Sequence, residues 1–181
     1  MGIVSKINMI LVSACVGIGV GAQPILGFNK GAGNHGRIRE TYIKAIKMAT
    51  IVSVIGWLCC MIFPYQIISL FGTDNVEFTT FAVKSMRIFL SAVFCAGFQI
   101  VSTSYFQATG QPGKASILSM LRPIILLVPI ILVLPLFWGI DGILYAGPIA
   151  DYSTAFIIAL FILPELMKLK TSDTTLTLGE N

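Results

Sequence analysis

The chain has 181 residues, of which 56% are hydrophobic and 11% are charged, and its formal net charge is +4. The charged fraction is less than half of the roughly 25% usual in soluble domains, which excludes a water-soluble fold. The excess of Lys and Arg does not indicate nucleic-acid binding, because these residues form no basic stripe with interleaved aromatics.

Five stretches are long and apolar enough to cross a bilayer, which takes about 20 helical residues. We therefore expect an all-α integral membrane protein in which residues 1–170 form one lobe. The polar segment 171–181 is expected to be a disordered cytoplasmic tail. The five expected spans cover approximately residues 7–29, 45–71, 78–109, 115–138 and 140–167.

The distribution of basic residues predicts the orientation of these spans. The break after the first span holds five Lys or Arg residues between Lys30 and Lys47, whereas the break 71–78 holds two acids and no base. By the positive-inside rule, the first break is cytoplasmic, the second is external, and the C-terminus is cytoplasmic. Lys84 and Arg87 do not fit this pattern, and we interpret them as snorkelling or as lining an aqueous vestibule. The chain is expected in the cell membrane.

Glycine and proline modify the first and fourth spans. Gly17 and Gly21 lie four residues apart on one helical face, which allows another helix to approach closely. Pro123, Pro129 and Pro135 recur through the fourth span, and each removes a backbone donor from the helix. We expect the fourth span to be bent or locally broken.

The third span carries a polar stripe. Gln99, Ser102 and Tyr105 follow one another in three-residue steps and so share roughly one face of a helix. A polar stripe on a membrane helix should face a neighbouring helix or a cavity rather than lipid. Hydrogen bonding between helices and a surface for substrate both remain open.

Arg122 and Asp151 interrupt the last two spans at similar depths, estimated at 1.5 Å per residue. An unpaired charge at such depth costs about 3 kcal/mol on insertion scales. Adjacent antiparallel helices would let the two side chains pair. The pair either locks the two helices together or takes part in binding cations or protons.

The sequence favours neither an enzyme nor a metal or redox site. The four cysteines lie in apolar stretches without a CxxC spacing, and the single histidine, His35, has no second His or Cys nearby. No catalytic motif or cluster of ionisable groups with catalytic spacing lies in a span. We expect no catalytic residues, no metal and no cofactor.

Two segments resemble a known family of transporters. The first is Gly21-Ala-Gln-Pro-Ile-Leu-Gly-Phe-Asn-Lys-Gly-Ala-Gly-Asn34, in which Gln23, Pro24, Gly31 and Asn34 carry the motif, and the second is Tyr105-Phe-Gln-Ala-Thr-Gly-Gln-Pro-Gly-Lys-Ala115. Together with Leu121-Arg-Pro123 and Pro148-Ile-Ala-Asp151, they resemble the C-terminal lobe of the multidrug and toxic compound extrusion (MATE) transporters.

The resemblance implies the last five of twelve helices in a two-lobed antiporter. Such a protein exports small organic compounds, often cationic, against a sodium or proton gradient. The candidates for a substrate and ion pathway are the polar and ionisable residues inside the spans, namely Gln99, Ser102, Tyr105, Arg122 and Asp151. The expected partners are membrane lipid and a missing N-terminal lobe. We expect a fragment that is inactive alone. A lipid-linked-sugar flippase of the same superfamily and a structural membrane subunit are the alternatives.

Overall fold

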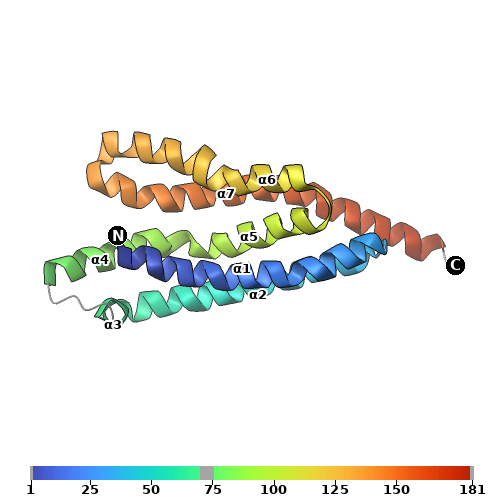
Figure 1. Ribbon diagram of the computed structural model, residues 1–181, viewed down its shortest axis with the longest axis horizontal. Helices are drawn as coiled ribbons and strands as arrows, with labels where there is room; N and C mark the ends of the chain where they lie inside the picture. The colour runs from blue at the N-terminus through green and yellow to red at the C-terminus, as the bar shows by residue number, and fades with distance from the viewer. Residues whose placement is uncertain (1, 70–75, 180–181) are drawn as a thin grey trace.

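The structure, a computed structural model, describes residues 2–69 and 76–179. Every element in these ranges is helical (Figure 1). Five helices are long and apolar enough to cross a membrane, which confirms the expected fold class. They cover Val4–Gly31, His35–Ile62, Ala82–Ala108, Pro112–Leu136 and Gly142–Leu169.

Some spans consist of more than one helical segment. The third span is α4 followed by a short 3₁₀ turn and α5, and the fourth is α6 followed by a π-helical segment and the start of α7. The elements are α1 (Gly2–Gly31), α2 (His35–Ile62), α3 (Pro64–Ser69), α4 (Val76–Phe89), η1 (Leu90–Ala92), α5 (Val93–Ala108), α6 (Pro112–Met120), η2 (Leu121–Leu127) and α7 (Val128–Gly179).

The second span begins and ends earlier than the expected 45–71. Helix α2 already starts at His35 and runs through the basic residues, because Lys and Arg are good helix formers and charge alone does not end a helix. It stops at Ile62, since the following Phe63 precedes Pro64, and a residue before proline is disfavoured in the helical region. Phe63 accordingly has φ −116° and ψ 44°.

Helix α7 contains the last turn and continues beyond the last span. Gly139 has φ 55° and ψ −137°, a conformation that only glycine adopts readily, so the chain reverses there within the expected turn 138–141. After this reversal α7 runs to Gly179. Residues 171–179 of the segment expected to be a disordered tail are therefore helical in the structure. Residues 180–181 lie outside the described part.

Two turns at the same end of the bundle are built in the same way. Gly33 and Gly110 have φ +71° and +75°. At the first turn, the Gly33 amide donates to the Lys30 carbonyl and the Asn34 amide to the Asn29 carbonyl. This is the Schellman arrangement, which satisfies the free carbonyls at a helix end. Gly110 and the residue after it repeat it with the carbonyls of Gln107 and Phe106.

Helices α1, α2 and α5 pack against one another, and α7 packs against α5 and η2 (Figure 1). The core where the first three meet is aromatic. The rings of Tyr42 and Tyr105 lie 5.1 Å apart, and Phe106 meets Tyr105 edge to face at 5.4 Å. Lys114 of α6 pairs with Glu165 of α7 at 2.7 Å, joining the two helices near the same end as the Schellman turns.

Candidate functional site: a polar cavity beside an ion pair

A cavity of about 400 Å³ opens between α1, α5, α6 and η2. One charged residue, Arg122, is among the described residues that line it, and the rest are neutral. The lining residues are Val16, Val20, Gln23, Gln99, Ile100, Thr103, Ser104, Gln107, Leu118, Ser119, Arg122 and Pro123.

Helix α5 supplies most of the polar wall. Gln99, Thr103 and Gln107 follow one another in four-residue steps, which places them one above another on a single helical face. Gln23 of α1 donates a hydrogen bond of 2.9 Å from Nε2 to Oε1 of Gln107. This amide pair joins the two helices across the cavity wall and gives the predicted motif residue Gln23 a defined contact.

Close packing of α1 on α5 depends on Gly19. A Cβ atom at this position would lie 2.7 Å from Oγ of Ser104 and 3.3 Å from Cγ2 of Ile100, both shorter than ordinary contacts. Glycine therefore lets α1 approach α5 closely enough for Gln23 to reach Gln107. The Gly17 position differs, because a Cβ atom there would meet nothing within 4 Å.

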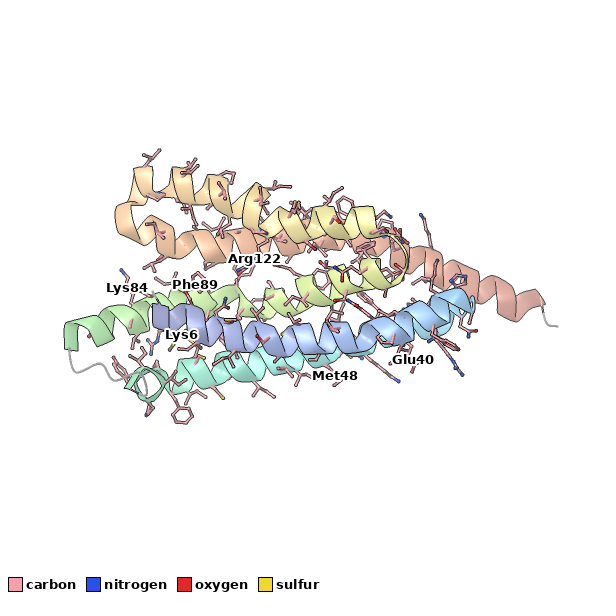
Figure 2. All side chains as sticks on the ribbon, viewed as in Figure 1. Lys6, Glu40, Met48, Lys84, Phe89 and Arg122 are labelled. Atoms are coloured by element: carbon pink, nitrogen blue, oxygen red, sulfur yellow. The ribbon has the colours of Figure 1, made fainter. Side chains whose placement is uncertain are left out.

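Arg122 and Asp151 form a direct ion pair. Arg122 Nη2 donates to Asp151 Oδ2 at 3.3 Å, and Arg122 Nε donates to Oδ1. The Asp151 residue is only 5% exposed, whereas a third of the Arg122 side chain is exposed and lines the cavity. Figure 2 shows Arg122 between the α6 and α7 helices and α5. The structure thus brings together the two residues whose depths suggested a pair.

Gln99 connects this pair to the polar wall. Its side chain donates from Nε2 to the backbone carbonyl of Asp151 at 2.8 Å and is 6% exposed. Arg122 donates to both carboxylate oxygens of Asp151, and Gln99 donates to the backbone carbonyl of the same residue. A buried charge pair is stable only when its remaining polar atoms are satisfied in this way. The contact fixes α7 against α5 at the level of the cavity.

Arg122 projects from the π-helical segment η2 (Leu121–Leu127). Pro123 lacks an amide proton and clashes with the carbonyl four residues earlier, so a regular α-helix cannot pass through this position without distortion. The change to π-helical hydrogen bonding is a local break in the α-helix at Pro123, as expected for a span that was predicted to be bent or locally broken. Such segments are rare and are frequently found at functional sites.

Ser102 and Tyr105 do not line the cavity. The Tyr42 hydroxyl lies 2.8 Å from Oγ of Ser102, and the Tyr105 ring contacts the Tyr42 ring at a tilt of 60°, so both residues face α2. Each three-residue step along a helix falls short of a full turn by about 60°, so a stripe of such steps drifts around the helix. The four-residue spacing of Gln99, Thr103 and Gln107 marks the face of α5 that lines the cavity, and the three-residue spacing marks the face that packs on α2.

The other motif residues lie within α1 and in the turn between α1 and α2. Pro24 lies inside α1, Gly31 is its last residue, and Asn34 precedes α2 and completes the Schellman turn. None of these three is among the residues that line the cavity. Within residues 2–69 and 76–179, no group of three His, Cys, Asp or Glu side chains is arranged to hold a metal ion.

Comparison with known sequences gives consistent matches. Residues 1–137 match the model of the MatE family. Multidrug export protein MepA of Staphylococcus aureus is 24% to 26% identical over 171 residues, which are 92% of this chain and 36% of that protein. MepA of Staphylococcus haemolyticus is 24% identical over 158 residues. The chain thus spans about a third of the length of the curated relatives that it matches.

Solved structures share the fold. The MATE multidrug transporter DinF-BH, determined in complex with a rhodamine dye, is 35% identical with a TM-score of 0.83, and the match covers 90% of this chain and 36% of that one. An outward-facing MATE family transporter of the MOP superfamily matches with a TM-score of 0.86 at 19% identity, over 94% of this chain and 38% of that one.

Proposed function

Because the chain belongs to the MatE family of membrane transporters, we propose that it forms the C-terminal part of a cation-coupled multidrug antiporter. Family membership confirms the resemblance read from the Gln-Pro and Tyr-Phe-Gln-Ala segments, and members of this family are transporters and not enzymes. The observation that carries the proposal is the cavity with the polar face of α5, bounded by membrane-spanning helices.

The transported compounds are small and organic, and often cationic, and the driving ion is Na⁺ or H⁺. The apolar part of the cavity wall, with Val16, Val20 and Ile100, suits the hydrophobic body of such a compound. Transport follows alternating access, in which one helical bundle rocks against another around the binding site. The chain supplies one of these bundles, and the part of the family's length that it does not cover supplies the other.

The protein acts in the plasma membrane with its C-terminus in the cytoplasm. The five basic residues from Lys30 to Lys47 and Lys168 support this orientation. In the structure, the α1–α2 turn and the start of α6 lie toward one end of the bundle, and the α2–α3 junction lies at the other (Figure 1).

A hybrid transporter tests the function. The part of DinF-BH that matches this chain is replaced by residues 1–170, and accumulation of the rhodamine dye is measured in a drug-sensitive bacterial host. We expect the hybrid to lower accumulation toward the level of intact DinF-BH. The sodium gradient and the proton gradient are then dissipated one at a time. The effect should disappear with only one of them, and that one identifies the coupling ion. A hybrid that reaches the membrane in normal amount but leaves accumulation at the empty-vector level would contradict the proposal.

The chain expressed alone provides the matched comparison. We expect cells that contain it to accumulate the dye as cells with the empty vector do, because one bundle has nothing to rock against. Efflux by the chain alone, with no second bundle coexpressed, would show that the proposed division of labour is wrong.

A further inference from the structure

The charge that the cavity presents is positive. Arg122 is the charged residue among the described residues lining the cavity, and no carboxylate belongs to that set. The carboxyl group of Asp151 lies behind it, with 7% of its side chain exposed against 33% for Arg122. The ion pair is therefore oriented, with its positive end toward the cavity and its negative end buried between α5 and α7.

Arg122 retains donors for a ligand. A guanidinium group has five N–H donors in a planar fork, and Asp151 takes one from Nε and one from Nη2. No other hydrogen bond of Arg122 is found within residues 2–69 and 76–179. The donors that remain include the whole of Nη1, the terminal amino group that does not contact Asp151. An arginine held in place in this manner binds carboxylates and other oxyanions without first having to be ordered.

The walls around Arg122 suit the same ligand. Gln99, Thr103 and Ser119 are neutral, so they do not compensate the guanidinium charge, and amide and hydroxyl groups can donate to an oxyanion. Leu118 and Pro123 lie beside them and offer apolar surface. In a site with little water, a hydrogen bond from a charged donor is stronger than in solution.

We propose that this cavity binds the acidic group of an amphiphilic organic compound, a carboxylate or equivalent oxyanion, on Arg122, with the apolar body of the compound against Val16, Val20 and Ile100. The inference rests on the proposed function and narrows its small organic compounds, at this cavity, to those that carry an acidic group, whether or not they also carry a positive charge. Zwitterionic compounds belong to this class through their acidic end. A purely cationic compound would have to displace Arg122 from Asp151 to reach a carboxylate in this part of the cavity.

Three probes that share a pyrene ring on a short alkyl chain and differ in their end group, which is anionic, neutral or cationic, test the inference. They are pyrenebutyric acid, its methyl ester, and pyrenebutyl trimethylammonium, and their binding to the full chain in nanodiscs of zwitterionic lipid is followed by fluorescence anisotropy at pH 8. We expect the acid to bind at least about tenfold more tightly than the ester or the ammonium compound, which is the effect of one hydrogen bond to a charged group. Tightest binding of the ammonium probe would overturn the inference and leave the proposed drug cavity intact. Binding of none of the three would overturn both.

Two variants locate the effect. The double variant Arg122→Gln with Asp151→Asn replaces the ion pair by two neutral amides of similar size, so no buried charge is left unpaired, and we expect it to lose the preference for the acid. The matched control is Lys44→Gln, which also removes a positive charge but lies on α2, pairs with Glu40 and does not line this cavity. It should retain the preference. An unchanged preference in the double variant, or its loss in Lys44→Gln, would refute the assignment to Arg122.

Discussion

At the scale of single residues, the ion pair of Arg122 and Asp151 shows what a charge inside a membrane helix needs. Asp151 is almost fully buried, and its carboxylate and its backbone carbonyl both have hydrogen-bond partners. The similar depths of Arg122 and Asp151 in the bilayer, estimated from their positions along the last two spans, predicted that the two side chains would meet. They did not indicate which of the two would reach the cavity, because that depends on how η2 and α7 are rotated against each other.

This pair leads to a prediction for stability. Arg122→Gln should lower the free energy of unfolding by about 3 kcal/mol, because it leaves the charge of Asp151 buried without a partner. Asp151→Asn should lower it by less, because a third of the Arg122 side chain is exposed. The double variant should recover to within about 1 kcal/mol of the original chain. Thermal unfolding in detergent, followed for all four proteins, measures the coupling. Additive losses would show that the two side chains do not stabilise each other.

A second residue-scale prediction concerns the packing of α1 on α5. Gly19→Val should destabilise the chain by about 1 to 3 kcal/mol through overpacking against Ser104 and Ile100. It should also weaken probe binding in the cavity, since the approach of Gln23 to Gln107 depends on this contact. Gly17→Val is the control in the isolated chain, because its added side chain meets open space. Equal losses for the two variants would exclude close packing at Gly19 as the cause.

At the scale of elements, the turns are the best explained parts of the sequence. The second motif segment contains Gly110, and the helix α6 starts two residues later at Pro112, where a missing amide proton does not matter. Gly110 needs a positive φ, so only glycine fits it without strain. Gly33, near the end of the first segment, also has a positive φ, so the same reason favours glycine there.

Replacing Gly110 tests this explanation. Gly110→Ala should lower the free energy of unfolding by about 1 kcal/mol, because an L side chain is disfavoured at positive φ. Gly113→Ala, three residues further and inside α6, should be neutral or stabilising, because alanine is the better helix former and no atom lies within 4 Å of the added carbon. Chemical denaturation of both variants measures the difference. A neutral Gly110→Ala would mean that the turn does not need the left-handed conformation.

The number and type of the helices could be predicted from the sequence, because a bilayer allows long apolar segments few alternatives. Their ends could be predicted less well. Charge placed the start of the second span near residue 45, whereas the turn at Gly33 sets it at His35. The cavity was predicted only in part, with Gln99 and Arg122 in its wall and Ser102 and Tyr105 turned toward α2. The rotation of a helix about its own axis is decided by its neighbours, which a pattern along one helix does not contain.

At the scale of the whole molecule, the two ends of α2 should lie on opposite sides of the membrane. The basic turn before it favours the cytoplasm for Asn34, and the far end of the same helix leads to Tyr65 in α3. With the four native cysteines replaced, Asn34→Cys should be protected from an impermeant thiol reagent added to intact cells. Tyr65→Cys, at a position that is 57% exposed, should react. Labelling of Asn34→Cys alone would reverse the orientation proposed for every helix.

The π-helical segment also has a meaning for how such chains can change length. A π-helical turn holds more residues than an α-helical one, so a short segment of this kind is what a one-residue insertion produces when the helix on either side keeps its place. Removing one residue between Leu121 and Leu127 would return the segment to α-helical register. The helix on either side of the deletion would then keep its place. A one-residue deletion within η2 should therefore disturb the fold less than a deletion in a regular α-helical part, where all residues on one side would turn by about 100° relative to the other.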